Sequence, residues 1–145
     1  MYRCPDCGTF NQIPSVREAG APSCSHCHQR LDLSGAPQEV SAENYHQVRG
    51  TSPVPVVVDF WAAWAPPSRE ADLVVELFAR RNAGKVLVVK VNSDKSPKLL
   101  ARLGIEAVPT FQAINGGEEL ARHGGVLPHD AFERWAGRAF SRPAA

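Results

Sequence analysis

All four cysteines of this 145-residue chain lie within its first 27 residues, in two Cys-x-x-Cys pairs. The pairs are Cys4-Pro5-Asp6-Cys7 and Cys24-Ser25-His26-Cys27, and sixteen residues separate them. This spacing is typical of a structural zinc site, in which each pair forms a tight turn that offers two thiolates to one metal. A disulfide framework would instead spread its bridges through the fold that it stabilises. The cysteines therefore predict one local metal site with Cys4, Cys7, Cys24 and Cys27 as its ligands.

Two disulfides or four idle thiols are the alternatives to metal binding. Metal binding is favoured because no export signal is expected, and disulfides persist mainly in exported proteins. The apolar residues between the pairs (Phe10, Ile13 and Val16) are too few to form a core. We therefore expect one structural Zn²⁺ to supply most of this segment's folding free energy, on the order of 10 kcal/mol. His26 and His28 are expected to be solvated and not to act as ligands.

Charge and hydropathy argue against several classes of protein. Sixteen Lys and Arg residues balance fifteen Asp and Glu residues, whereas a nucleic-acid-binding domain is expected to be basic. No apolar run approaches the roughly 18 residues that a membrane-spanning helix needs. The first residues, Met1-Tyr2-Arg3-Cys4-Pro5, lack the apolar stretch of a signal peptide. We therefore expect a cytoplasmic protein that binds neither nucleic acid nor membrane, with enough hydrophobic residues (43%) for a packed core.

The length of the chain fits one domain of ordinary size with a small appendage. Ser34-Gly35-Ala36-Pro37 has the composition of a short linker. We therefore divide the chain into a zinc ribbon (1–33), a linker (34–38) and a larger domain (39–145). The ribbon has no excess of positive charge with which to bind phosphate, so we expect it to be structural or to dock a protein.

Segments with the periodicity of helices and strands alternate along the larger domain. We expect, in chain order, a helix at 41–48, a strand at 55–60, a helix at 68–81, a strand at 86–91, a helix at 97–103, strands at 110–114 and 118–123, and a helix at 128–140. A helix between two buried strands predicts that the strands are parallel, and Asn115-Gly116-Gly117 predicts an antiparallel hairpin. The fold class is therefore α/β, with a central mixed β-sheet flanked by helices.

Apolar side chains at helical spacing predict which faces of the helices are buried. In the helix at 68–81 the expected core residues are Leu73, Val74, Leu77 and Phe78. In the last helix they are Phe132, Trp135 and Phe140.

Two charged residues interrupt the apolar strands. Asp59 precedes Phe60 in the strand at 55–60, and Lys90 lies between Val89 and Val91 in the strand at 86–91. A buried ion pair between neighbouring strands would explain both residues. The alternatives are that Asp59 is hydrated at a strand end and that Lys90 reaches solvent at a sheet edge.

Four features together resemble the thioredoxin family. Residues 57–64 (Val-Val-Asp-Phe-Trp-Ala-Ala-Trp) resemble the strand that leads to its active-site helix, and residues 104–110 (Gly-Ile-Glu-Ala-Val-Pro-Thr) resemble its cis-proline loop. Residues 115–117 resemble its hairpin, and Gly125 stands where a glycine lines the substrate groove. The resemblance runs from about Glu39 to the C-terminus and implies the thioredoxin fold. With the four-cysteine segment in front, the chain is similar to the zinc-binding, thioredoxin 2 type.

The resemblance implies a thiol–disulfide oxidoreductase that reduces protein disulfides and receives electrons from a thioredoxin reductase. In the family, one cysteine at a helix N-terminus attacks as a thiolate and a second resolves the mixed disulfide. In this chain these catalytic positions hold Ala65 and Ser68. Alanine carries no nucleophile, and a serine hydroxyl has a pKa far too high to replace a thiolate without a base. We therefore expect the chain to be redox-inactive.

The resemblance also assigns roles to the residues around these two positions. It implies that Asp59 is a buried carboxylate that moves protons for the resolving cysteine, with Lys90 beside it. Pro109 would be the cis-proline that presents its backbone to an extended substrate. The implied substrate groove consists of Trp64, Pro66, Pro67, Val108, Pro109 and Gly125. For Trp64, simple packing in the core is the alternative.

Three functions are compatible with these residues. The first is an oxidoreductase whose cysteines have been replaced deliberately, since alanine and serine are the usual substitutes and their neighbours remain thioredoxin-like. The second is a naturally redox-silent module that holds extended peptide, or acts as a chaperone, through the groove. The third is an adaptor whose zinc ribbon recruits a partner. An acidic helix start without the family's proline near Leu73, and Gln112-Ala113 in a normally apolar strand, favour natural loss of redox chemistry.

Overall fold

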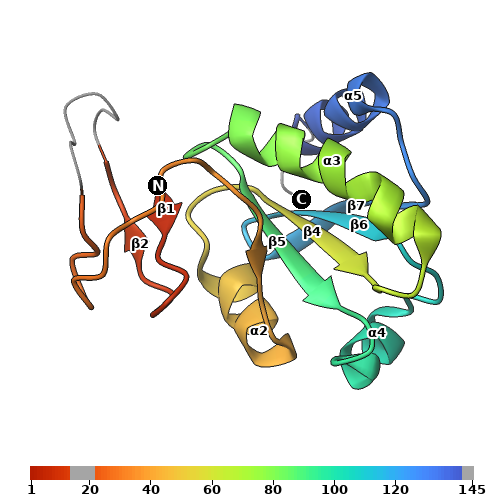
Figure 1. The fold of residues 1–145 in the computed structure, drawn as a ribbon, viewed down its shortest axis with the longest axis horizontal. Helices are drawn as coiled ribbons and strands as arrows, with labels where there is room; N and C mark the ends of the chain where they lie inside the picture. Colours follow the sequence, from red (N-terminus) through yellow and green to blue (C-terminus); the bar gives the residue numbers. More distant parts are fainter. Residues whose placement is uncertain (14–21, 142–145) are drawn as a thin grey trace.

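The computed structural model describes residues 1–13 and 22–141, and every statement about the fold refers to these ranges. Val16, one of the apolar residues between the cysteine pairs, and the last four residues of the predicted larger domain lie outside them. Figure 1 shows a small N-terminal unit beside a larger one, in which a sheet lies between two layers of helices. No helix among the described residues is long and apolar enough to cross a membrane.

The large sheet has five strands in the order β3-β5-β4-β6-β7. Their bounds are Gln38–Glu39 (β3), Val56–Trp61 (β4), Leu87–Asn92 (β5), Thr110–Asn115 (β6) and Glu118–Gly124 (β7). β3, β5 and β4 are parallel, whereas β6 runs antiparallel to β4 and β7 antiparallel to β6. The sheet is therefore mixed, as the sequence predicts, and β4 lies in its centre.

Helices cover both faces of this sheet (Figure 1). α2 (Ala42–Thr51) and α4 (Pro97–Leu103) lie on one face, and α3 (Pro66–Arg81) and α5 (His129–Phe140) lie on the other. The predicted order of helices and strands is confirmed. The sequence does not predict β3, which is two residues long, begins inside the predicted linker 34–38 and pairs with β5.

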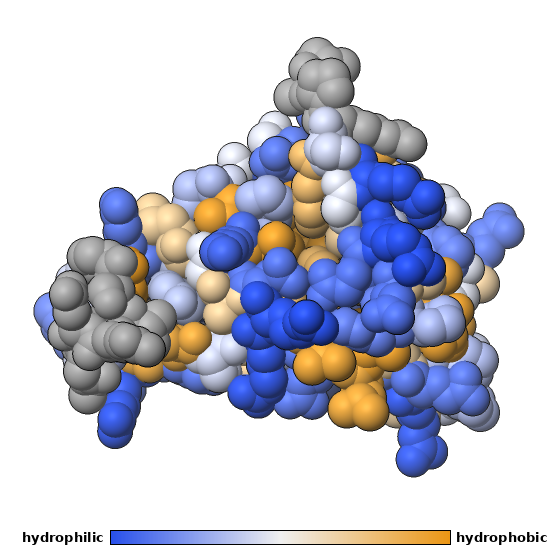
Figure 2. Space-filling view, turned by 90° about the horizontal axis from the view of Figure 1, so that it is seen from above, coloured by the Kyte–Doolittle hydropathy of each residue, from blue (hydrophilic) through white to orange (hydrophobic). Residues whose placement is uncertain are grey.

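The prediction for the buried face of α3 is wrong at two positions. Leu73 is 76% exposed and Leu77 is 42% exposed. The side chains of this helix that are buried are those of Ser68, Ala71, Val75, Phe78 and Ala79. Two apolar stripes run along α3, and the one with two alanines packs on the sheet because small side chains allow close approach. Figure 2, seen from the side of α3 and α5, shows apolar surface among the hydrophilic side chains of this face.

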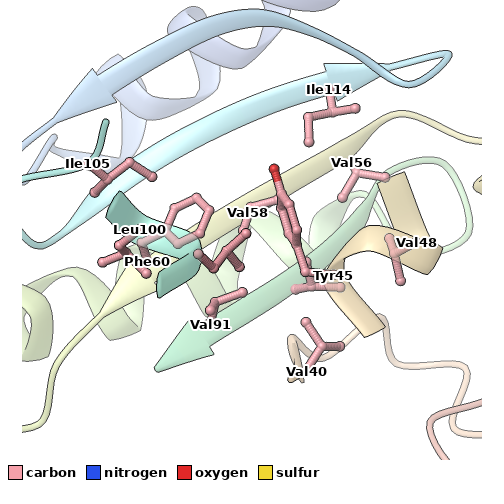
Figure 3. Close-up of a cluster of buried hydrophobic side chains, with 12 residues drawn as sticks. Val40, Tyr45, Val48, Val56, Val58, Phe60, Val91, Leu100, Ile105 and Ile114 are labelled. Atoms are coloured by element: carbon pink, nitrogen blue, oxygen red, sulfur yellow. The ribbon is translucent and has the colours of Figure 1, made fainter. Parts of the chain in front are cut away.

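The core between α2, α4 and the sheet surrounds the ring of Tyr45 (Figure 3). This ring lies 5.8 Å from that of Phe60, and its hydroxyl points toward β6. The second core lies between the sheet and the pair α3 and α5. Its large aromatic members are Phe78, Phe111, Phe132 and Trp135. Phe132 and Trp135 are buried as predicted, whereas Phe140 is half-buried.

Gln112 lies in β6 without exposed surface. Its Oε1 accepts a 2.6 Å hydrogen bond from the Tyr45 hydroxyl, and its Nε2 donates to Glu119 Oε1 at 3.2 Å. Arg49 Nη1 donates in turn to the Tyr45 hydroxyl at 3.1 Å. A chain of hydrogen bonds thus connects α2, β6 and β7, and it explains how a polar amide is accommodated in a normally apolar strand.

We expect Gln112→Leu to lower the free energy of unfolding by about 1–3 kcal/mol, because it leaves the buried Tyr45 hydroxyl without its acceptor. Combining Gln112→Leu with Tyr45→Phe should recover part of this loss, because both members of the pair are then apolar. Urea unfolding of the single and double variants measures these values. A double variant that is less stable than the sum of the single effects would contradict this account.

The N-terminal unit is attached to the β3 edge of the large sheet. It contains β1 (Tyr2–Arg3) and β2 (Phe10–Asn11), which pair antiparallel. Arg3 Nη1 donates to Gln38 Oε1, and Gln38 Nε2 donates to the carbonyl of Arg3, both at 2.8 Å. The Tyr2 ring lies so close to Gly84 that a Cβ there would come within 2.9 Å of the hydroxyl. The unit therefore packs on the larger one through specific contacts.

Candidate metal centre and candidate active site

The four cysteine side chains converge on one point. Their sulfur atoms all lie within 4.8 Å of one another, and the Sγ–Sγ distances of Cys4–Cys27 and Cys7–Cys24 are both 3.6 Å. None of the four forms a disulfide. Four sulfur atoms at the corners of a tetrahedron, each about 2.3 Å from a metal, are about 3.8 Å apart. The arrangement could therefore hold one tetrahedrally coordinated metal ion.

Both Cys-x-x-Cys turns are closed by the same backbone hydrogen bond. The N–H of Gly8 donates to the carbonyl of Cys4 at 2.8 Å, and the N–H of His28 donates to that of Cys24 at 3.0 Å. The residue after the second cysteine has a positive φ in each turn, +81° at Gly8 and +65° at His28. Glycine adopts this conformation without steric cost, and histidine does so at a small cost. The two turns therefore present their thiols in equivalent ways.

Neighbouring donors stabilise the thiolate of Cys24. Asn11 Nδ2 donates to its Sγ at 3.6 Å, and the N–H of His26 donates at 3.4 Å. The backbone N–H of Cys27, which contributes most, and these two donors lower the pKa of Cys24 to about 6. His26 and His28 are exposed and do not belong to the cluster of ligand atoms, as expected. The sequence does not predict Asn11, because only the fold brings it to the second turn.

The N-terminus of α3 has no side-chain cap. Its N-cap residue is Ala65, which is 4% exposed, and the exposed Pro66 and Pro67 follow. The helix begins two residues before the predicted start, since a proline in the first turn needs no partner for an N–H. Ser68 is 1% exposed, and its Oγ accepts a 3.3 Å hydrogen bond from the N–H of Ala62. No thiol is present at this helix end, because all four cysteines of the chain lie in the N-terminal cysteine cluster.

Trp64 lies next to this helix end and is 70% exposed, so the alternative of core packing is wrong. Its Nε1 donates to Asp94 Oδ1 at 3.1 Å, a contact that fixes the ring and that the sequence does not predict. The bond between the half-buried Val108 and the buried Pro109 is cis, as the resemblance implies. The structure brings Gly125 to this proline, because the N–H of Gly125 donates to the carbonyl of Pro109 at 2.9 Å.

Asp59 is completely buried within β4. Neither of its carboxylate oxygens has a hydrogen-bond partner among the described residues. Burial raises the pKa of Asp59 to about 7, although Lys90 acts in the opposite direction. Asp59 therefore does not lie at an exposed strand end.

The buried ion pair of Asp59 and Lys90, one of the two alternatives that the sequence leaves open, is not formed. The two residues are direct neighbours in the β4–β5 register, but Lys90 Nζ lies 3.0 Å from Asp72 Oδ1. The same amine lies 4.8 Å from the centre of the Trp61 ring, whose Nε1 donates to Glu39 Oε1 at 3.1 Å. The sequence does not predict these contacts of Lys90, because they depend on how α3 and β3 lie over the end of the sheet.

Comparison with known proteins identifies the family to which this fold belongs. Residues 36–138 match the family model of thioredoxin, which covers more than half of the chain. The chain belongs to the thioredoxin family. Thioredoxin C-3 of Corynebacterium nephridii is 30% identical over 132 residues, which are 91% of this chain and 90% of that protein. Thioredoxin 1 of Nostoc sp. is 38% identical over 64% of this chain and 87% of its own length.

A solved structure agrees with the family assignment. The crystal structure of the Malassezia sympodialis thioredoxin superposes on this chain with a TM-score of 0.66. The two sequences are 29% identical, and the alignment covers 77% of this chain and 97% of that one. The chain therefore has the thioredoxin fold. Thioredoxins in general are thiol–disulfide oxidoreductases that act on protein disulfides with a thioredoxin reductase as electron donor.

Proposed function

We propose that this thioredoxin is redox-inactive, because Ala65 and Ser68 hold the positions of the nucleophilic and resolving cysteines. The observation that carries the proposal is the N-terminus of α3, where Ala65 is the N-cap and Ser68 is the first buried side chain of the helix. In an active parent, a thiolate at the first position attacks one sulfur of a substrate disulfide, and the other substrate sulfur leaves as a thiolate. The thiol at the second position then displaces the substrate from the mixed disulfide.

Neither step has a nucleophile in this chain. Ala65 ends in a methyl group, and the hydroxyl of Ser68 has a pKa far above that of a thiol. The Ser68 oxygen also accepts a hydrogen bond from the N–H of Ala62. In an active parent, Asp59 would exchange a proton with the resolving cysteine, and its pKa of about 7 suits that role at neutral pH. Asp59 is therefore present as in an active thioredoxin, although the resolving cysteine with which it would exchange a proton is absent.

A naturally redox-silent module that binds extended peptide, as a chaperone or adaptor, is the second candidate function. The observation that favours it is the exposed ring of Trp64, whose indole is held by Asp94. A large aromatic side chain that is already fixed loses little entropy when it contacts a peptide. The groove proposed for such a peptide consists of Trp64, Pro66, Pro67, Val108, Pro109 and Gly125.

We also propose that Cys4, Cys7, Cys24 and Cys27 bind one structural Zn²⁺, as in the zinc-ribbon, thioredoxin 2 type. Four thiolate ligands without an open position are typical of structural zinc, and sulfur distances of 3.6 Å fit that geometry. The similarity to Thioredoxin C-3 spans 132 residues, more than the range 36–138, and so extends into the N-terminal segment. The zinc ribbon would then comprise residues 1–33, the linker 34–38 and the thioredoxin domain 39–145. A cytoplasmic location stays a prediction.

Reduction of insulin by a thiol donor tests the proposed inactivity. The unsubstituted chain should leave the rate unchanged, whereas Ala65→Cys combined with Ser68→Cys should accelerate the reaction, because it restores both thiols. Ala65→Cys alone is the matched control. It has the attacking thiol without the resolving one, so after reduction and incubation with insulin in the absence of the thiol donor it should accumulate as a mixed disulfide that mass spectrometry detects. Insulin turbidity measures the rate.

Acceleration by the unsubstituted chain would overturn the proposed inactivity. A folded, metal-loaded double variant that does not reduce insulin would overturn the assignment of positions 65 and 68. Binding of an unfolded peptide by the unsubstituted chain, together with loss of this binding in Trp64→Ala, would support the redox-silent module.

The origin of Ala65 and Ser68 can be tested separately. The thioredoxin-like residues around them favour deliberate replacement of two cysteines, whereas Asp72, Leu73 and Gln112 favour a lineage that has left redox chemistry. Cysteine codons at positions 65 and 68 of the natural gene are expected in the first case and alanine and serine codons in the second.

A further inference from the structure

Lys90 has acidic neighbours on three different elements, Asp59 on β4, Glu39 on β3 and Asp72 on α3, and only Asp72 binds its amine. Asp59 is its direct partner in the β4–β5 register, and Asp72 comes from α3. The amine lies 3.0 Å from Asp72 Oδ1, whereas both oxygens of the buried Asp59 lack a hydrogen-bond partner among the residues described. Lys90 therefore pairs with the solvent-accessible Asp72, although a counter-ion would lower the cost of burying a charged carboxylate at Asp59.

Further contacts hold the amine in this position. It lies 4.8 Å from the centre of the Trp61 ring, within the range of a cation–π interaction. The indole Nε1 of Trp61 donates to both carboxylate oxygens of Glu39, at 3.1 and 3.2 Å. The side chain of Lys90 is 19% exposed and that of Asp72 is 51% exposed, so this ion pair lies at the surface.

We propose that Asp72 is a positioning residue that holds Lys90 at the surface and thereby leaves Asp59 without a counter-ion. The proposal does not depend on the redox activity of the chain, because it concerns only the protonation of a buried acid. A half-exposed ion pair contributes little to stability. The effect of Asp72 is therefore expected through the titration of Asp59 and not through the strength of the ion pair itself.

The charged groups that face Asp59 are Lys90 from β5, Asp72 from α3 and Glu39 from β3. Burial is the main cause of the raised pKa of Asp59; Lys90 lowers it, and the two acids raise it further. An amine released from Asp72 would approach Asp59, whose oxygens lack a partner, in preference to Glu39, whose two oxygens already accept from the Trp61 indole. An opposite charge within about 4–6 Å lowers the pKa of a carboxyl group by about 1–3 units. Asp72 thus keeps a proton on Asp59 at a pH where a paired carboxyl group would have lost it.

Replacement of Asp72 by asparagine tests this role. In Asp72→Asn the titration midpoint of Asp59, followed by the ¹³C shift of its carboxyl carbon, should fall by about 1 pH unit or more. The indole N–H resonance of Trp61 should also move, because the amine leaves its ring. Glu76→Gln is the matched control, since it removes another exposed carboxylate of α3 that pairs with Arg80. In this control neither the midpoint nor the Trp61 resonance should change.

Asp72 could raise the titration midpoint of Asp59 in two ways, by holding Lys90 away or by its own negative charge. A double variant separates these two effects, because removing the charge of Asp72 would by itself also lower the midpoint. In a Lys90→Met background, Asp72→Asn should lower the midpoint by less than half as much as in the parent. An undiminished fall in that background would overturn the proposal, because Asp72 would then act without the lysine. An Asp72→Asn midpoint equal to that of Glu76→Gln would overturn it as well.

Discussion

Removal of the proposed zinc ion by a chelator is expected to unfold residues 1–13 and 22–33 while the five-stranded sheet and its helices stay folded. The reason is the composition of the small core in this unit. Its buried members are Cys4, Cys24 and Leu31, so two of the three are proposed metal ligands. Without metal, Leu31 and the half-buried Ile13 and Leu33 bury too little apolar surface to offset the entropy of ordering the segment. The proposed metal would supply the difference, on the order of 10 kcal/mol.

Amide hydrogen exchange with and without chelator measures this effect. The amides of Gly8 and His28, which close the two cysteine turns, should lose their protection, whereas the amides of β4 should keep it. One zinc ion per chain should be released. Cys24→Ser should reproduce the effect of the chelator, and His26→Ala, which alters an exposed side chain in the same turn, should retain the metal. A metal-free chain whose turn amides remain protected would refute the proposed role of zinc.

The order of helices and strands is predictable from the sequence because it follows from local periodicity. The hydrophobic runs of β4 and β5, and the Asn115-Gly116-Gly117 turn, each indicate an element without reference to the rest of the chain. β3 is different. Its two residues carry no strand pattern, and they become a strand because Gln38 is bound by Arg3 and pairs with the edge of β5.

The buried face of α3 shows a second limit of local patterns. Leu73 and Leu77 form an apolar stripe at helical spacing, and so do the side chains around Phe78. Periodicity alone does not distinguish the two stripes, because the choice depends on the shape of the surface that receives the helix. The sheet receives the stripe with the small alanines, and the leucines remain exposed.

The candidate metal centre can be predicted from local sequence spacing, whereas the environment of Lys90 cannot. The four cysteines lie in two local turns, so their spacing along the chain predicts that they converge. The partner of Lys90 depends on which residue of α3 lies above β5 in the folded chain. The sequence indicates Asp59 as a partner of this lysine, whereas packing brings Asp72 to its amine and leaves Asp59 without a partner among the described residues.

The free energy of unfolding is expected to fall as the pH rises from 4 to 7, because the folded chain binds a proton at Asp59 more tightly than the unfolded chain does. Burial raises the pKa of Asp59 from its ordinary value of 3.8 to about 7. Since the folded-state pKa is the higher one, the stabilising contribution of this proton is fully present below pH 4 and is lost as the pH rises through 7. A shift of this size corresponds to a loss of about 4 kcal/mol.

Asp59→Asn should remove most of this pH dependence, because its amide keeps the size of the side chain and cannot ionise. Between pH 5.5 and 8.5 the contribution of Asp59 should fall by about 2 kcal/mol in the parent, and the variant should lack this contribution. Urea unfolding at intervals of pH measures both slopes. Glu70→Gln, which removes an exposed carboxylate of α3, should leave the slope of the parent unchanged. Equal slopes for the parent and Asp59→Asn would mean that burial does not hold the proton on this carboxyl group.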